Sequence, residues 1–368
     1  MHKIYADYLC PDWGDAYLIG LLNLAMRERC DIRSEAVLTG ELVHQLKTEL
    51  IPALVKYAPR LYAPSITADM ADEPPPSAGK TGTGCSCGID SLYAIKCLSE
   101  SDIPSIHLDY LAINNVGAYT NGGKSDGRRY ADNVANARAF AARYGYKLIV
   151  TDSNFSEAFP QNHYKTHLYS SCFAIHMLGG LWGRYYYASS GYDNMQDGFK
   201  LTNNESDAAD RYDLIALPSF STSRLRICNQ GPPASRFEKT KSLADYEPAK
   251  HYLNVCLRQG AGNCGYCPKC MRTLWALDAL DKLSGFYDVF DVGNYQENHD
   301  YYMRLLYRSY LNGFDHHLND ESWRILKRRA CLLSMCYERV FSWLRFGAIG
   351  APLRWAYRLV RRRLIAPR

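Results

Sequence analysis

The chain has 368 residues, of which 47% are hydrophobic and 22% charged, proportions typical of a globular protein with a sizeable core. No apolar run approaches the ~18 residues of a membrane-spanning helix, and the first residues lack the apolar stretch of a signal peptide. The thirteen cysteines are an odd number. We therefore expect a cytoplasmic protein whose thiols are reduced or bind metal, and we exclude a disulfide framework.

The net charge of +5 is unevenly distributed. Residues 324–368 hold twelve of the 43 basic residues and one of the 38 acidic ones, so residues 1–323 are mildly acidic. Apolar side chains at helical spacing predict a basic amphipathic tail. We favour packing of the apolar face of this tail on the acidic part of the chain, residues 1–323, over binding to a membrane or to RNA. Our hypothesis is that its second helix, residues 353–365, meets the inner membrane surface or an acidic partner, and nucleic-acid phosphates are not excluded.

The pattern of apolar residues divides the rest of the chain. Helical spacing predicts an α-rich N-terminal unit over residues 1–73, and the prolines of residues 74–79 predict a linker. Residues 283–323 are expected to form a helical extension. Between the linker and this extension, residues 80–255 form the main domain and residues 256–282 a cysteine-rich element.

Strands and helices are expected to alternate within the main domain. The expected strands are 80–85, 104–112, 147–150, 184–188, 213–217 and 225–228, and the expected helices are 92–98, 129–144 and 166–182. Alternation at this spacing implies parallel strands with right-handed crossovers, hence an α/β fold with a doubly wound parallel sheet. Ligands of such sheets bind at the carboxyl ends of the strands.

A glycine-rich stretch, Gly82–Lys96, follows the first expected strand and reads GTGCSCGIDSLYAIK. It is not a Walker A loop, because Pro74 stands five places before Gly79 where that motif has glycine. It is not a dinucleotide fingerprint either, because Cys87 takes the place of the third glycine. Small residues before a helix N-terminus favour a phosphate site, and a simple strand-to-helix turn is the structural alternative.

Residues 86–91, S-C-G-I-D-S, resemble the S-G-G-x-D-S signature of the PP-loop ATP pyrophosphatases. Enzymes of that class split ATP into AMP and pyrophosphate to activate an oxygen of their substrate. Cys87 departs from the pattern, which has glycine there. The residues that the resemblance assigns to ATP are Ser86, Cys87, Gly88, Ile89, Asp90, Ser91 and Asp109. For Asp109, a role as a simple strand terminus is an equal alternative. The resemblance also implies a magnesium ion at Asp90, although a helix-capping role for this carboxylate is equally compatible with the sequence.

Four cysteines lie within fifteen residues farther along the chain, Cys256, Cys264, Cys267 and Cys270. Four thiolates at this spacing suit one tetrahedral zinc ion with no open position, which makes the ion structural. An iron–sulfur cluster and unligated thiols are the alternatives.

The combination of this loop with C-x7-C-x2-C-x2-C resembles the 7-cyano-7-deazaguanine synthase (QueC) family over residues 80–282. That resemblance implies a fold of the HUP/PP-loop type, zinc on the four cysteines, and conversion of a carboxylate with ATP and ammonia. The expected arginine-containing segment is missing, since residues 166–169 read THLY. The acceptor is therefore open: a small-molecule acid or a protein or peptide carboxylate.

We expect an ATP-dependent, AMP- and pyrophosphate-forming carbon–nitrogen ligase that adenylates a carboxylate for attack by ammonia or an amine. Its catalytic residues are predicted to be Asp90, Arg236 and Lys239, since cations at the active edge stabilise phosphate charge. A solvated helix face is the alternative for the two cations. An RNA-modifying or sulfur-transferring PP-loop enzyme and an inactive nucleotide-binding module are the alternative functions.

Overall fold

In the computed structural model, the described residues are 3–121, 124–125, 127–189, 212–258, 262–311 and 316–329. The predicted tail from residue 330 onward lies outside them. The chain forms two compact units, Met1–Ala261 and Gly262–Arg368, which are taken separately below.

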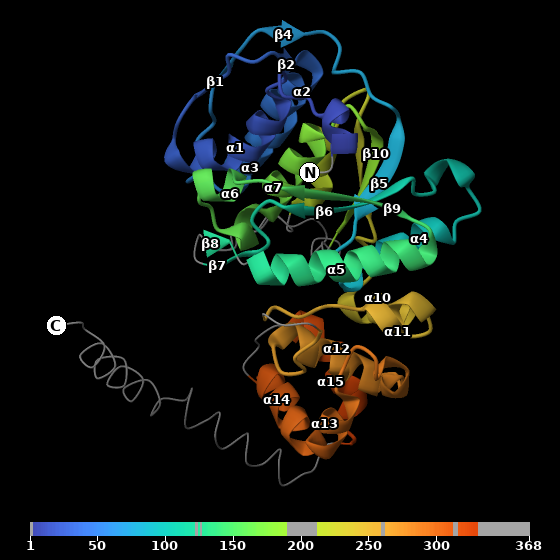
Figure 1. Ribbon diagram of the computed structural model, residues 1–368. Coiled ribbons are helices and arrows are strands. Elements are labelled where there is room, and N and C mark those ends of the chain that lie inside the picture. Colours follow the sequence, from blue (N-terminus) through green and yellow to red (C-terminus); the bar gives the residue numbers. More distant parts are fainter. Residues whose placement is uncertain are drawn as a thin grey trace, which may run out of the picture. The chain divides into compact units, whose positions relative to one another are not determined.

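A five-stranded parallel sheet organises the first unit (Figure 1). Its strands are β5 (Lys80–Gly84), β6 (Tyr110–Asn115), β9 (Lys147–Asp152), β10 (Trp182–Ala188) and β11 (Arg226–Gln230). The spatial order is β11-β10-β5-β6-β9, so the direction in which strands are added reverses beside β5. All neighbouring pairs are parallel, which confirms the predicted parallel α/β architecture.

Helices connect the strands, and two more follow the last strand, β11. They are α4 (Ile89–Ser99), α5 (Gly127–Tyr144), α6 (Phe155–Ala158), α7 (His163–Met177), α9 (Asp213–Ser219), α10 (Arg236–Leu243) and α11 (Glu247–Tyr252). Figure 1 shows α4 and α5 on one side of the sheet, and α7 together with α1 (Asp15–Glu28) on the other. A short hairpin of β7 (Thr120–Asn121) and β8 (Lys124–Ser125) precedes α5.

The N-terminal segment shares a hydrophobic core with the sheet. Its elements are η1 (Lys3–Tyr8), β1 (Ile32–Arg33), β2 (Leu38–Thr39), α2 (Gly40–Gln45), the π-turn η2 (Leu46–Leu50), α3 (Ile51–Tyr57), β3 (Ile66–Thr67) and β4 (Met70–Ala71). Leu22 of α1 and Leu42 of α2 lie in one buried cluster with Trp182 of β10. Burying these apolar faces against each other is the main force that holds the segment to the sheet.

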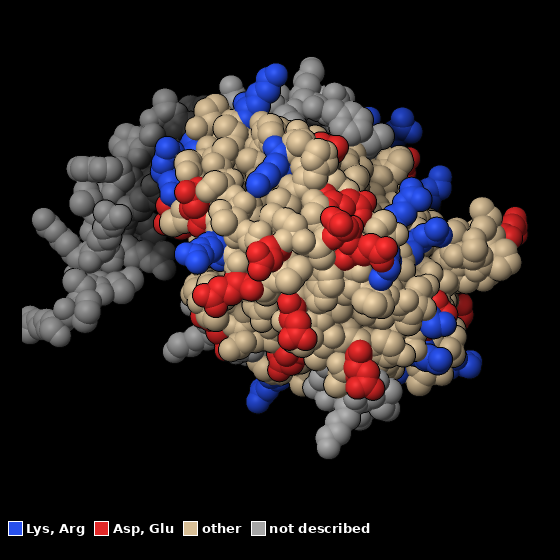
Figure 2. Space-filling model, turned by 90° about the horizontal axis from the view of Figure 1, so that it is seen from above, with Lys and Arg blue, Asp and Glu red and all other residues tan. Residues whose placement is uncertain are grey.

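The charged side chains on the described surface of this segment are mixed in sign. Figure 2 shows acidic and basic groups interspersed on that face rather than gathered into one field. This view of the described residues therefore shows no continuous basic surface of the kind that suits nucleic acid.

Several predicted elements differ from the structure. The helix predicted over residues 92–98 is α4, which begins at Ile89 and so takes in the last three residues of the predicted loop at 86–91. Asp213–Leu217, predicted as a strand, belongs to helix α9, where Asp213 stands in the first turn and favours the positive end of the helix. Strand β6 begins at Tyr110, because Pro104 opens the 3-10 turn η3 (Pro104–Ile106). Helix α7 ends at Met177, before Gly179 and Gly180, and β10 starts at Trp182.

The second unit is helical. It contains α12 (Pro268–Ala279), η5 (Leu283–Phe286), α13 (Val292–Glu297), α14 (His299–Leu311) and α15 (His316–Leu326). Polar side chains of this unit gather around the carboxylate of Asp278 in α12. That carboxylate accepts hydrogen bonds from Tyr295 Oη at 2.8 Å and from His299 Nε2 at 3.1 Å. Arg329 Nη1 donates to the same side chain at 3.1 Å.

Candidate functional site

The glycine-rich loop lies at the carboxyl end of β5, at the point where the strand order reverses. Its hydroxyl groups bond within the loop: Ser86 Oγ lies 3.2 Å from Ser91 Oγ and accepts from the Gly88 N–H at 3.3 Å. Ser91 Oγ donates to the Gly88 carbonyl at 3.1 Å. Gly88 is the N-cap of α4, and no side chain caps it. The loop therefore presents a helix N-terminus at the edge where ligands of parallel sheets bind.

Cys87 has a left-handed backbone with a φ of +55°. This region favours glycine because a Cβ atom crowds the following carbonyl, which explains why a glycine would suit the position. The Cys87 side chain is fully buried, and its Sγ lies 3.8 Å from Cys85 Sγ. The hydrogen bond with Cys85 and burial raise the pKa of the Cys87 thiol well above its usual value. A protonated, buried thiol is a poor nucleophile.

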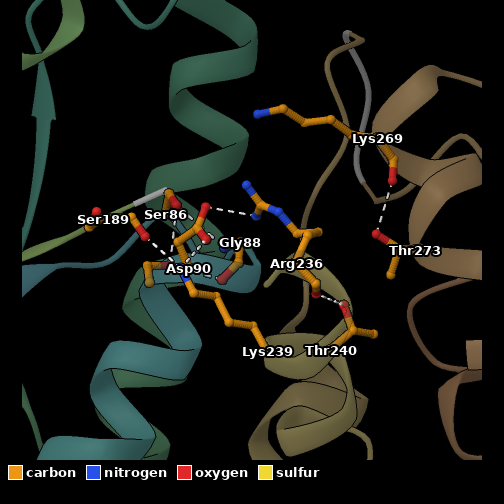
Figure 3. Close-up of polar contacts among 10 residues, drawn as sticks. Ser86, Gly88, Asp90, Ser189, Arg236, Lys239, Thr240, Lys269 and Thr273 are labelled. Atoms are coloured by element: carbon orange, nitrogen blue, oxygen red, sulfur yellow. Dashed lines mark hydrogen bonds and ion pairs between the residues drawn. The ribbon is translucent and has the colours of Figure 1, made fainter. Parts of the chain in front are cut away.

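Two cations from α10 converge on Asp90, the second residue of α4 (Figure 3). Arg236 Nη1 lies 2.7 Å from Asp90 Oδ2, and Lys239 Nζ lies 3.1 Å from Oδ1. Helix α10 is held in place at its start by a capping box, in which Ser235 and Glu238 bond each other's backbone N–H groups. The three predicted catalytic residues therefore meet at the loop, although Asp90 and Lys239 are 149 positions apart.

Lys239 is an unusual lysine because its side chain is only 2% exposed. Its ammonium also donates to the Ser189 carbonyl at 2.5 Å and lies 5.8 Å from the centre of the Tyr93 ring. Burial lowers the pKa of Lys239, and the charges of Asp90 and, more weakly, Asp213 oppose that shift. The predicted alternative, a solvated helix face, does not describe this residue.

The surroundings of Asp90 do not fit a magnesium ion. Each carboxylate oxygen already accepts from a cationic side chain. Magnesium requires near-octahedral oxygen ligands at about 2.1 Å, and two cations on the same carboxylate would repel it. The geometry instead gives Asp90 the role of orienting Arg236 and Lys239.

Asp109 is not brought to the loop. It precedes β6, where its backbone N–H donates to the Thr81 carbonyl and its carboxylate accepts from the Thr81 N–H at 2.8 Å. Thr81 stands at the amino end of β5, roughly 10 Å of strand away from the loop. This position suits a strand terminus rather than a nucleotide contact.

Sequence reasoning missed Ser189 and Asp213. Ser189 follows β10 and Asp213 begins α9, and Ser189 Oγ donates to Asp213 Oδ2 at 2.5 Å. The signal for Ser189 was present, because it directly follows a strand, β10, that neighbours β5. Asp213 could not be found in this way, since its segment was predicted as a strand.

The four cysteines form one group. The Sγ atoms of Cys256, Cys264, Cys267 and Cys270 all lie within 4.8 Å of one another. A zinc ion with four sulfur ligands at about 2.3 Å places the sulfurs about 3.8 Å apart, and Cys264 Sγ lies 4.0 Å from Cys270 Sγ. The Cys267 N–H points to Cys264 Sγ at 3.3 Å, and Gly265 takes a φ of +78° between them. The group could bind a metal ion such as zinc.

Comparison with known proteins finds neither a protein-family model nor a curated protein that matches this chain. Within the described part of the chain, none of the helices has the length and apolar character needed to cross a membrane.

Proposed function

We propose that the chain is a PP-loop ATP-dependent ligase that forms AMP and pyrophosphate, with a doubly wound sheet of the HUP type. The strand order supports the fold, because a reversal beside β5 creates the crevice in which doubly wound sheets bind nucleotides. The observation that carries the function is the convergence of Arg236 and Lys239 on Asp90 at the loop.

The proposed chemistry needs positioning and charge stabilisation more than a nucleophile. When a carboxylate oxygen attacks the α-phosphate of ATP, the bond to the β-phosphate breaks and negative charge grows on the departing pyrophosphate. The ammonium of Lys239 and the guanidinium of Arg236 would stabilise that charge, and the α4 N-terminus would add its partial positive charge. Ammonia or an amine then attacks the acyl adenylate and releases AMP.

One observation weighs against the sulfur-transferring alternative. A sulfur-transferring enzyme needs an accessible thiol, whereas Cys85 and Cys87 are buried. An inactive nucleotide-binding module would use Lys239 for phosphate in the same way, so AMP formation from ATP is what separates it from the ligase. The acceptor is proposed to be a small-molecule acid or a protein carboxylate.

The first experiment measures binding of ATP and of inorganic pyrophosphate by calorimetry. We expect the wild-type chain to bind both, and Lys239→Ala to weaken binding about tenfold or more, which corresponds to about 1.4 kcal/mol. Lys241→Ala is the matched control, because Lys241 lies on the same helix and is exposed.

The second experiment identifies the products from ATP labelled at the α-phosphate, with pools of candidate acids and ammonium. AMP formation that depends on an acid supports the proposal. Formation of ADP and phosphate instead would contradict it.

We also propose that the four cysteines hold a structural zinc ion. They supply four soft ligands and leave no open position, so the ion would stabilise the fold around residues 256–270 rather than take part in catalysis. Elemental analysis of the purified protein should give one zinc per chain, and iron with labile sulfide would contradict this assignment.

A further inference from the structure

Ser189 lies where β10 ends, and its three polar groups bond to three different elements. Its N–H donates to the Gln230 carbonyl of β11 at 3.1 Å, and its carbonyl accepts from Lys239 Nζ at 2.5 Å. Its hydroxyl donates to Asp213 Oδ2 at 2.5 Å. The residue is completely buried. A residue held at all three groups has little freedom, so its carbonyl holds the Lys239 ammonium in one place.

Asp213 supplies the carboxylate that accepts the hydrogen bond from the Ser189 hydroxyl. It is 1% exposed, and its backbone carbonyl accepts from Asn229 Nδ2 of β11 at 3.3 Å. Burial of a carboxylate is costly unless hydrogen bonds and opposite charge compensate for it. Its negative charge also acts on the ammonium of Lys239. Asp213, which lies outside the loop, therefore stabilises the ammonium of Lys239, which lies beside the loop.

We propose that Asp213 and Ser189 are positioning residues for Lys239. Asp213 fixes Ser189, and the Ser189 carbonyl fixes the ammonium beside Asp90. The consequence for phosphate binding rests on the proposed function, whereas the positioning of Lys239 can be measured without it.

The test compares three variants with a matched control. Asp213→Ala removes both the acceptor and the charge, Asp213→Asn keeps an acceptor oxygen, and Ser189→Ala removes only the hydroxyl link. The control is Asp15→Asn. Asp15 is 4% exposed and accepts from Thr39 Oγ1 at 2.5 Å, so it forms the same kind of buried carboxylate–hydroxyl pair in another part of the unit.

Two readouts separate this inference from the proposed function. The first is the affinity for inorganic pyrophosphate by calorimetry. The second is the side-chain ammonium resonance of Lys239 in NMR, assigned by its loss in Lys239→Ala and measured without any ligand. Thermal unfolding accompanies both, so that a general loss of stability is recognised.

We expect Asp213→Ala to weaken pyrophosphate binding about tenfold, Asp213→Asn and Ser189→Ala to weaken it less, and Asp15→Asn to leave it unchanged. The ammonium resonance should broaden or shift in the three test variants alone. A folded Asp213→Ala with wild-type affinity and an unchanged resonance overturns the inference. If Asp213→Ala does not fold, the same criterion applies to Ser189→Ala: a folded variant with wild-type affinity and an unchanged resonance overturns the inference. If the wild-type chain does not bind pyrophosphate, the proposed function fails, and the resonance alone supports or overturns the positioning.

Discussion

Asp90→Asn should destabilise the protein, because Lys239 would remain buried without the negative charge of Asp90 beside it. Removing one member of a fully buried ion pair costs about 3–5 kcal/mol, whereas a surface pair contributes about 1 kcal/mol or less. The Asp90 side chain is 23% exposed and Lys239 2% exposed. Lys239 also keeps its bond to the Ser189 carbonyl. We therefore expect Asp90→Asn to lower the free energy of unfolding by about 1–3 kcal/mol.

The argument is tested by a double-mutant cycle with Lys239→Met. In the Lys239→Met background, Asp90→Asn no longer leaves the buried Lys239 ammonium without its carboxylate. The loss of unfolding free energy in the double variant should therefore be smaller than the sum of the two single losses by about 1–2 kcal/mol. The assay is urea unfolding followed by tryptophan fluorescence, with the slope checked for constancy. Asp90→Asn combined with Lys241→Met is the control and should be additive within about 0.5 kcal/mol. Additivity of Asp90→Asn with Lys239→Met would refute the reasoning.

Four further predictions address other parts of the chain. Cys87→Gly should change the free energy of unfolding by about 1 kcal/mol or less, because relief of the left-handed backbone offsets the lost thiol contact, whereas Cys87→Val should destabilise by about 2 kcal/mol or more in the same urea assay. The hydrogen bond to Asp278 raises the pKa of His299 above 6.5, so its stabilisation should be complete below that pH and lost as the pH rises through the folded-state pKa. His299→Gln should flatten this part of the stability–pH curve, and an unchanged curve would contradict the assignment. If the four cysteines hold the proposed zinc, Cys267→Ser should lower the zinc content in elemental analysis and the melting temperature, since metal binding contributes folding free energy. Asp109→Ala should leave pyrophosphate affinity unchanged, and a tenfold loss would place Asp109 at the loop after all.

The sequence alone was sufficient for features that depend on short stretches of chain. The parallel α/β sheet follows from alternating apolar strands and helices, and the turn at residues 86–88 that leads into α4 follows from small residues before a helix. The four cysteines come together because fifteen residues with glycine at position 265 can fold back on themselves. Arg236 and Lys239 could be proposed from sequence as cations near the edge of the sheet where a ligand was expected.

The tertiary structure decided which distant groups meet. Nothing in the sequence shows that Lys239 is buried against Ser189, or that Asp213 supports it, because these contacts depend on the strand order β11-β10-β5. A short apolar run such as 213–217 can be a strand or a buried helix, and only packing selects between them. Asp109 lies at the amino end of the sheet because β6 starts one residue later, at Tyr110. Periodicity locates elements along the chain, whereas burial and pairing across the sheet determine which edge each side chain reaches.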